Sequence, residues 1–363
     1  MAFAALDPEA AGNNKQHLNL SPLAYEVVLS DMFTFGEEKL SGFINTIFAQ
    51  YAPTAEASVS RALNVMRGEL AKCLAGILGD EKTKNRIVQR LVSQERERLI
   101  EQASSYGGGK SFKFWLNKEN LLYLTQADSE CGEEAYYTKR GKYIKSVVEE
   151  YARLPYVRRE QIYFLPFVET IQCAIREEKQ LRVVTGADTV YSVYAYDILC
   201  DPLSTANYLV GYCRRYGFSE EKKRPGSFRI CALKSVRMEK SKSAFVKESE
   251  RKELAQKVAA RGAAFMAGSE TEIHVRLTEA GMYKYQRQAH LRPVLVRREE
   301  DRFVFQCTLA QAEFYFFKFG KDAEILRPEP LREKVKTMYE EAAKAYGAAV
   351  TAGPQGPMNT NYP

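Results

Sequence analysis

Two stretches of the chain place apolar residues in the same helical pattern. The segment FINTIFAQYA, residues 43–52, and the segment YIKSVVEEYA, residues 143–152, carry aromatic or aliphatic side chains at five matching positions. The spacing i, i+1, i+4, i+5, i+8 puts these side chains on one face of an amphipathic helix. The sequence therefore predicts an internal repeat in which each copy contains a helix with one buried face.

The likeness between the two copies continues upstream of these helices. Residues 17–36 and residues 113–132 both begin with alternating apolar positions, pass through a residue typical of a helix N-cap, Ser21 or Asn117, and end on a glycine. Alternation indicates a strand, and the capping residue and the glycine mark the two ends of a first helix. Each copy therefore predicts a strand followed by two helices.

A strand followed by two helices within about forty residues resembles the ribbon-helix-helix fold, in which two such units pair their strands into one antiparallel ribbon. We expect two units of this kind, at about residues 15–53 and 111–155, inside a helical region that spans residues 1–160. Two copies in one chain indicate an internal pseudo-dimer, although the sequence leaves open whether the strands pair within one chain or between chains.

The outward side of such a ribbon is a candidate surface for nucleic acid. Alternation along the strands places these side chains there: Lys15, His17, Asn19, Lys113 and Trp115. The set is poor in the arginine and glutamine side chains that read base edges, so the pattern favours a structural ribbon over one that reads duplex DNA. Trp115, the only tryptophan of the chain, is expected to be packed rather than stacked on a base.

Residues 54–106, between the copies, predict two helices. In the second, residues 80–102, charges of both signs surround a stripe of isoleucine, leucine and valine, which is typical of an exposed helix with one buried face. Three glycines at positions 107–109 predict a hinge before the second ribbon strand.

The pattern changes to that of a sheet from about residue 164. Residues 164–184 predict a helix that runs into a strand, and residues 189–238 contain three further segments that alternate with period two and are rich in aromatic and β-branched side chains. Turn residues at 201–202 and 225–226 separate these segments. The pattern predicts the strands of a small barrel.

This region resembles the WYL domain, a family with an Sm-like, SH3-type barrel that is named for its Trp-Tyr-Leu signature. Residues 207–209 read Asn-Tyr-Leu, so tyrosine and leucine match while an asparagine replaces the tryptophan. A Phe-Arg pair of the family is present at residues 228–229, whereas the Arg-Ile pair that usually follows is missing. The resemblance implies a WYL domain over residues 161–248.

The pattern after residue 249 resembles the extension that often follows a WYL domain. Strand-like segments, a glycine turn and the sequence ILRPEPLREKV match the family's strand, proline turn and closing helix. We therefore expect an α+β extension domain over residues 249–346 and a disordered tail over residues 347–363. With the ribbon units and the barrel included, the predicted fold class of the chain is α+β.

Charge is distributed unevenly along the chain. The formal net charge is +7, and between residues 214 and 247 eleven lysines and arginines stand against three acidic residues. Cations beside aromatic side chains are the electrostatic footprint of a nucleic-acid binder, although a solvated basic face gives the same count. The segment NYLVGYCRRYGF, residues 207–218, combines both kinds of group.

Such a segment suits an unpaired base and its phosphate, because single strands are held by cationic grooves and by aromatic faces that stack on bases. For Arg229 we favour a phosphate clamp, as the resemblance implies, over a structural pair with Asp197 or Asp201. Whether Tyr208 is a stacking or a core residue stays open. The candidate nucleic-acid site consists of Asn207, Tyr208, Tyr212, Arg214, Arg215, Arg229 and Arg237.

Several function classes find no support in the sequence. The chain has no nucleophile elbow, P-loop, paired-carboxylate motif or HExxH, and its three histidines lie far apart, so we expect neither an enzyme nor a bound cofactor or metal ion. Seven cysteines without CxxC spacing suit a reducing compartment. No window is apolar enough for a membrane helix and the first residues lack a secretory pattern, so we expect a cytoplasmic protein without membrane contact.

The order of these regions, ribbon units followed by a WYL domain and its extension, resembles the WYL-domain accessory proteins of type VI-D CRISPR systems. That resemblance implies a homodimer that binds single-stranded RNA and stimulates an RNA-guided, RNA-cleaving effector. Two alternatives remain open. One is a DNA-binding transcriptional regulator with a ligand-sensing WYL domain, and the other is a WYL-centred sensor of a nucleotide-like small molecule.

Overall fold

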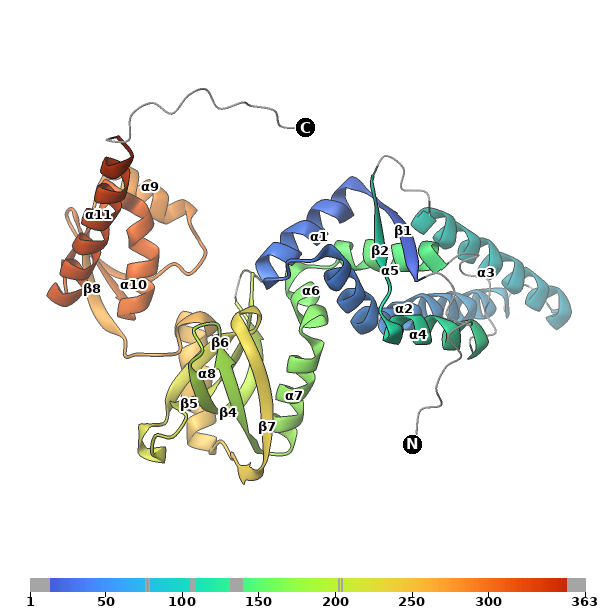
Figure 1. Cartoon of the computed structure of the whole chain (residues 1–363), viewed down its shortest axis with the longest axis horizontal. Helices are drawn as coiled ribbons and strands as arrows, with labels where there is room; N and C mark the ends of the chain where they lie inside the picture. The colour runs from blue at the N-terminus through green and yellow to red at the C-terminus, as the bar shows by residue number, and fades with distance from the viewer. Residues whose placement is uncertain are drawn as a thin grey trace. The chain divides into compact units, whose positions relative to one another are not determined.

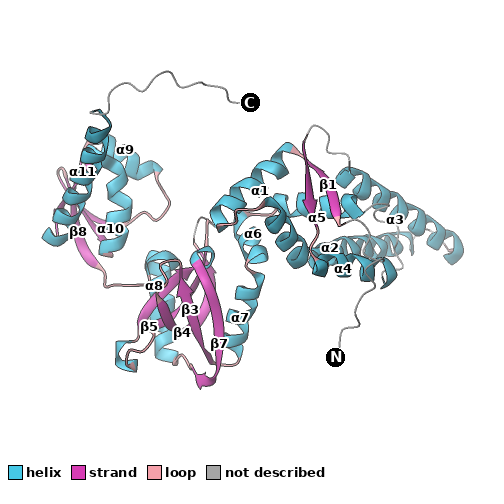
Figure 2. Ribbon diagram, viewed as in Figure 1, coloured by secondary structure: helices cyan, strands magenta, loops and turns pink. Residues whose placement is uncertain are grey.

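The structure of the protein is a computed structural model (Figure 1). It describes residues 14–75, 77, 79–104, 109–130, 140–201, 203 and 205–350. The chain divides into two compact units: the first runs to Glu169 and takes in Ile230–Ala232, and the second holds Thr170–Arg229 and the chain from Leu233 onward. Helices and sheets occur in both units (Figure 2), which confirms the predicted α+β class.

The first unit contains both copies of the predicted strand–helix–helix order. Its elements are β1 (Lys15–Leu20), α1 (Pro22–Phe35), α2 (Leu40–Ala75), α3 (Glu81–Ser104), β2 (Lys110–Trp115), α4 (Lys118–Glu130), α5 (Arg140–Arg153) and α6 (Tyr156–Tyr163), followed by α7 (Leu165–Arg176), which crosses into the second unit. The first copy was expected to end at about residue 53 and a separate helix to follow it, but α2 continues through Pro53 to Ala75, because the residues that follow the proline are mostly good helix formers. Gly132 and most of the predicted glycine hinge lie outside the described residues.

The two ribbon strands pair antiparallel within this one chain. The register places Lys15 opposite Trp115, His17 opposite Lys113, and Asn19 opposite Ser111. Ser21 caps α1 by accepting a hydrogen bond from the backbone N–H of Ala24, and Asn117 caps α4 in the same way through the N–H of Asn120. The internal pseudo-dimer predicted from the repeat is therefore present, and its ribbon needs no second chain.

The repeated apolar positions form the core of the first unit. Phe43, Ile44, Ile47 and Phe48 of α2 are fully buried, and so are their counterparts in α5, apart from Tyr143, which is half-buried. Leu18, Leu20 and Phe114 lie under the ribbon and join the same core. Burial of these side chains accounts for the helical periodicity seen in the sequence.

Each second helix also holds the strand–helix junction of the other copy. The Glu149 carboxylate of α5 accepts hydrogen bonds from the backbone N–H of Ser21 at 2.6 Å and from the Ser21 hydroxyl at 2.7 Å. Asn45 of α2 donates to the carbonyl of Trp115 at 2.8 Å and accepts from the backbone N–H of Asn117 at 2.9 Å. The two copies are therefore joined by reciprocal polar contacts as well as by a shared core.

A buried ion pair fastens α1 to α6 in the first unit. Asp31 is only 1% exposed, and the Arg159 guanidinium donates to its two carboxylate oxygens at 2.6 and 3.1 Å. The hydroxyl of Tyr151 donates to the same carboxylate at 2.8 Å. Burial and the neighbouring carboxylate raise the pKa of Tyr151 above its usual value, so that the phenol stays a donor.

The second unit begins with a five-stranded antiparallel sheet of strand order β6-β5-β4-β3-β7. Its strands are β3 (Lys179–Thr185), β4 (Val190–Cys200), β5 (Asn207–Arg215), β6 (Arg224–Arg229) and β7 (Leu233–Ser243). The predicted closed barrel is wrong, because no pairing between β6 and β7 closes the sheet in the described part of the chain. Edge strand β6 is short and contains Pro225, which has no backbone N–H to offer to a further strand.

Helix α8 (Glu248–Arg261) covers part of one face of this sheet. Val210 and Tyr212 of β5 and Tyr194 of β4 pack against it and against the chain that follows, in a cluster that includes Leu254 and Met266.

Among the described residues of the whole chain, no helix combines the length and the apolar character needed to cross a membrane.

The chain then forms a four-stranded antiparallel sheet of order β11-β8-β10-β9 with helices packed on it. Its elements are β8 (Thr271–Leu277), α9 (Glu279–Arg287), β9 (Val294–Glu299), β10 (Arg302–Cys307), α10 (Leu309–Phe316), the 3-10 segment Phe317–Asp322, β11 (Ala323–Arg327) and α11 (Glu329–Val350). Phe305, Tyr315 and Phe316 lie in its core. Residues 347–350, predicted to belong to a disordered tail, are helical here, and residues 351–363 lie outside the described residues.

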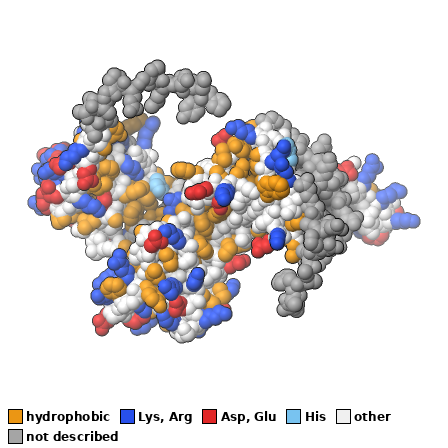
Figure 3. Space-filling view, in the orientation of Figure 1, with side chains coloured by type: hydrophobic (Ala, Val, Ile, Leu, Met, Phe, Trp, Pro, Cys, Tyr) orange, Lys and Arg blue, Asp and Glu red, His pale blue; other side chains and the backbone are white. Residues whose placement is uncertain are grey.

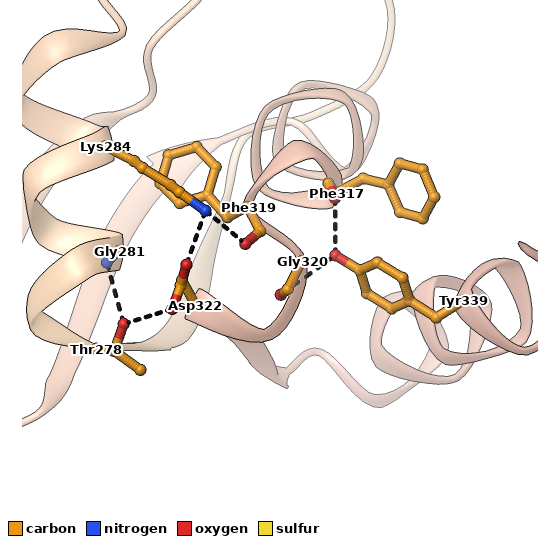
Figure 4. A network of polar contacts seen from close by, with 8 residues as sticks. All are labelled: Thr278, Gly281, Lys284, Phe317, Phe319, Gly320, Asp322 and Tyr339. Carbon is orange, nitrogen blue, oxygen red and sulfur yellow. Dashed lines mark hydrogen bonds and ion pairs between the residues drawn. The ribbon is translucent and has the colours of Figure 1, made fainter. Parts of the chain in front are cut away.

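A polar network fixes the turn before β11 (Figure 4). Lys284 of α9 donates to the Asp322 carboxylate at 2.7 Å and to the carbonyl of Phe319 at 3.1 Å, while the Thr278 hydroxyl donates to Asp322 at 3.0 Å. These hydrogen bonds hold the pKa of Asp322 below its usual value. Tyr339 of α11 donates to the carbonyl of Phe317 at 2.8 Å, so the network connects both helices to the turn.

Candidate nucleic-acid interface

A row of arginines crosses the sheet of the second unit. The strand register places Arg237 of β7 opposite Arg182 of β3, Arg182 opposite Ser192 of β4, and Ser192 opposite Arg214 of β5. Residues that lie directly opposite each other in a sheet point to the same face, and neighbouring strands are about 4.8 Å apart. The side chains of these residues therefore form a line about 14 Å long across four strands.

The side chains at one end of the line are exposed to solvent, and those at the other end are largely buried. Arg182 and Arg237 are exposed, whereas Ser192 is buried and the Arg214 side chain is only 14% exposed. On the face shown in Figure 3, lysine, arginine and hydrophobic side chains lie over the region of strands β4, β5 and β7, together with some acidic side chains.

Tyr216 provides an aromatic ring beside the open end of the row. Its backbone N–H donates to the carbonyl of Val190 at 2.9 Å, which extends the β4–β5 pairing beyond the end of β5. The side chain is 42% exposed, and both the Arg182 guanidinium and the Lys242 ammonium approach the ring centroid, at 4.6 and 5.3 Å. We call Arg182, Arg237, Lys242 and Tyr216 the Tyr216 patch.

Within the Tyr216 patch, positive charge is not fully compensated. Arg182 and Arg237 face each other with like charge, which is destabilising for a directly opposite pair. In the described part of the chain neither of them forms an ion pair, and the nearby carboxylate of Glu239 binds Lys242 at 3.0 Å instead. An anion between the two guanidinium groups would relieve this repulsion.

Arg214, one of the predicted site residues, is occupied by the protein itself. Its guanidinium donates to the Glu220 carboxylate at 2.8 Å and to the carbonyl of Phe218, and the Tyr194 hydroxyl donates to the same carboxylate. The hydrogen bond from Tyr194 and the charge of Arg214 lower the pKa of Glu220. Arg214 therefore braces the turn that carries Tyr216 rather than standing free for a ligand.

The predicted tyrosines of β5 face helix α8 instead of solvent. Tyr212 is 6% exposed and its hydroxyl donates to Glu253, so its ring is not open to an incoming base. Burial and that hydrogen bond raise the pKa of Tyr212 above its usual value. Tyr208 is half-buried against the same cluster, and Asn207 at the start of the strand is buried.

The remaining predicted residues lie apart from the row. Arg215 is exposed but alternates with Arg214, so it points to the opposite face, where Tyr191 pairs with it. Arg229 is exposed and pairs with Tyr208, six positions along β5 from Arg214. That separation corresponds to about 20 Å along the strand, too far for both arginines to hold one phosphate.

Arg182 and Lys242 were not predicted as site residues, although Arg237 was. Arg182 alternates with buried residues in the strand segment QLRVV, which indicates that it faces outward. The sequence does not reveal which strand lies beside it, and only the β3–β7 register brings it to Arg237. The sequence alone therefore does not predict that Arg182 lies opposite Arg237.

The outer ribbon face of the first unit is a second candidate surface. The predicted outward side chains of β1 and β2 are all exposed, and the Lys15 ammonium lies 5.5 Å from the centroid of the Trp115 ring. His17 shares a hydrogen bond of 2.8 Å with the Ser111 hydroxyl. Trp115 is 60% exposed, so the prediction that it is packed is wrong.

No cluster of three or more histidine, cysteine, aspartate or glutamate side chains that could hold a metal ion occurs among the described residues.

The reactivity of Cys213, next to Arg214 on β5, can be used to test whether this strand is buried. Burial raises the pKa of its thiol to about 11. Because only the thiolate reacts, we expect iodoacetamide at pH about 8 to alkylate Cys213 at least about a hundredfold more slowly than a thiol of ordinary pKa.

Peptide mapping by mass spectrometry over a time course would measure this difference. Cys200 is the internal reference because it is exposed and lies on the neighbouring strand. Equal alkylation rates at Cys213 and Cys200 in the folded protein would contradict the burial of β5.

Comparisons with known proteins show a shared fold. No family model and no curated protein matches the chain. Among solved structures, the chain is similar to a CRISPR Cas-related protein, with a TM-score of 0.66 and 22% sequence identity over 93% of this chain and 95% of that one. Proteasome accessory factor B/C (PafBC) of Arthrobacter aurescens aligns with a TM-score of 0.25 and 17% identity over 65% of this chain and 37% of that one.

Proposed function

We propose that the protein binds single-stranded RNA through the Tyr216 patch. The observation that carries the proposal is the pair of facing arginines, Arg182 and Arg237: within the described residues neither forms an ion pair with a carboxylate, and Arg182 lies against the partly exposed ring of Tyr216. A phosphate between the guanidinium groups would replace their repulsion with two charge-assisted contacts. A base of the same strand would stack on the exposed surface of Tyr216.

The combination favours an unpaired strand over a duplex. Stacking on a side chain needs a base whose face is free, and in a duplex both faces of an internal base are covered by its neighbours. A basic surface without an aromatic ring would serve either kind of nucleic acid. Tyr216 is therefore the residue that would make the patch prefer a single strand, whereas the arginines alone would bind any polyanion.

The proposal extends to an accessory role beside an RNA-guided, RNA-cleaving effector, which the protein would stimulate. Two facts support it: the resemblance of the chain to WYL-domain accessory proteins of type VI-D CRISPR systems, and the fold that it shares with a CRISPR Cas-related protein over almost the whole of both chains. RNA as the preferred strand and a homodimer as the working form belong to the same proposal. Cleavage rates of such an effector with and without the protein would test the role, and an unchanged rate would contradict it.

Binding is tested by fluorescence anisotropy with a labelled, unstructured RNA, the matching single-stranded DNA and a duplex. We expect the unstructured RNA to bind best, and we expect Arg182→Ala and Arg237→Ala each to weaken that binding about tenfold, equivalent to about 1.4 kcal/mol. Each variant should also reduce the dependence of the binding constant on salt, because one phosphate contact fewer releases fewer counterions.

Arg302→Ala is the matched control, because Arg302 is an exposed arginine on a different sheet of the same unit. Its affinity should stay within about twofold of the parent protein. If duplex DNA binds best, the regulator interpretation takes the place of this proposal. If a mononucleotide saturates the site as well as the polymer does, the small-molecule sensor replaces it.

A further inference from the structure

The outer face of the ribbon is built to attract a polyanion. Strands β1 and β2 together contain three lysines and no acidic residue. Two of the lysines, Lys15 and Lys113, point outward with His17 and Asn19, while the leucines and Phe114 on the inner side are buried. The charged side is therefore fixed in place by the core beneath it.

Trp115 is an exposed ring on a rigid backbone. Its carbonyl accepts hydrogen bonds from Asn45 at 2.8 Å and from Ser41 at 3.2 Å, and its N–H donates to the Ser41 hydroxyl at 3.3 Å. The backbone is thus held on both sides although the indole is 60% exposed. A large aromatic side chain that stays in water on a fixed strand offers a base a stacking surface that needs little further ordering.

The ribbon face is unsymmetrical. The equivalent caps Ser21 and Asn117 match Lys15 with Ser111, His17 with Lys113, and Asn19 with Trp115 between the two copies, and the strand register is compatible with this two-fold relation. None of the three pairs is alike. A two-fold ribbon that reads a palindromic duplex presents the same side chains to both half-sites, so the face fits a ligand that has no two-fold symmetry of its own.

We propose that this face is a second binding site for unpaired RNA, in which a base stacks on Trp115 and the phosphates on either side lie against Lys15 and Lys113. The choice of RNA rests on the proposed function, whereas the site itself stands on the first unit alone. Nothing in the Tyr216 patch is needed to form it.

The chain provides its own reporter for this site. Trp115 is the only tryptophan, so indole fluorescence reports on the ribbon and on nothing else. Titration of the full-length protein with unstructured RNA should quench this fluorescence to a plateau, because a stacked base contacts the indole directly. The double variant Arg182→Ala and Arg237→Ala, which disables the Tyr216 patch, should show the same plateau and a midpoint within about twofold of the parent.

Substitutions on the ribbon, unlike those in the Tyr216 patch, should change the quenching of Trp115 by RNA. We expect Lys15→Ala with Lys113→Ala to raise the RNA concentration at half-quench about tenfold, while Lys82→Ala, an exposed lysine outside the ribbon, leaves it unchanged. Heparin, a polyanion without bases, should compete with RNA for the lysines but should not itself quench the indole as RNA does.

The outcomes separate the two proposals. If RNA leaves the fluorescence unchanged while anisotropy still shows binding that depends on Arg182, the ribbon site is refuted and the Tyr216 patch stands. Quenching that disappears in the Arg182 and Arg237 variant also refutes an independent ribbon site. If duplex DNA quenches more strongly than RNA, the ribbon reads duplexes. If RNA quenches the indole and the anisotropy titration is unaffected by Arg182→Ala and Arg237→Ala, the ribbon site is supported and the Tyr216 patch is contradicted.

Discussion

Arg159→Met is expected to lower the free energy of unfolding of the first unit by about 3–5 kcal/mol. The substitution leaves the Asp31 carboxylate buried at 1% exposure with the Tyr151 hydroxyl but without its cation. An unpaired buried charge carries the full cost of its lost hydration, which is far larger than the packing that a methionine could restore. Urea unfolding followed by Trp115 fluorescence measures the loss, because that signal arises only in the first unit.

Two controls show whether the lost charge is the cause. Arg158→Met changes the exposed neighbouring arginine of the same helix and should cost less than about 1 kcal/mol. Adding Asp31→Leu to Arg159→Met removes the orphaned carboxylate and should recover most of the stability. An equal loss in the Arg158 variant, or no recovery in the double variant, would contradict the role given to the ion pair.

Gly211→Ala is expected to destabilise the second unit by about 3 kcal/mol. A Cβ atom at this position would lie 2.2 Å from the carbonyl oxygen of Tyr194 and 3.1 Å from the Cα of Ala195. Both atoms belong to the backbone of β4, so no side-chain rotation can make room, and β5 must move away from its neighbour. Scanning calorimetry would measure the lower unfolding temperature of this unit.

The same substitution should weaken RNA binding at the Tyr216 patch, because Tyr216 follows directly from β5. Gly347→Ala is the matched control within the second unit. Gly347 is an exposed glycine of α11 with nothing within 4 Å of an added Cβ, so alanine there should be neutral or stabilise by up to about 1 kcal/mol. A Gly211→Ala protein as stable as the parent would show that β4 and β5 are not packed as closely as described.

The elements that could be predicted from the sequence are those fixed by local rules. The two strand–helix–helix copies follow from helical periodicity and from the caps at Ser21 and Asn117, which depend on residues within one turn. The prediction of a closed barrel was wrong because closure requires the two edge strands to pair with each other. That pairing depends on the tertiary fold and cannot be predicted from a local sequence pattern. Pro225 is the one residue in β6 that argued against a further strand pairing there.

The predicted site residues and the Tyr216 patch overlap only in Arg237, and the difference has a structural reason. Aromatic and cationic residues of 207–218 alternate, yet alternation alone does not tell which face α8 covers. Tyr212 lies on the covered part and Tyr216, four residues later, extends past it. Arg182 comes from a strand more than thirty positions upstream, and only the tertiary fold brings it to Tyr216.

Because both ribbon strands belong to one chain, the stability of the ribbon does not depend on protein concentration, and its two halves can mutate independently. A ribbon made from two separate chains dissociates on dilution, whereas a ribbon closed inside one chain persists at any concentration, because its association is intramolecular. In a two-chain ribbon every substitution also appears twice, once in each half. Here one half can change while the other stays constant, so a lysine can be gained at one position without forcing a like charge at its two-fold mate.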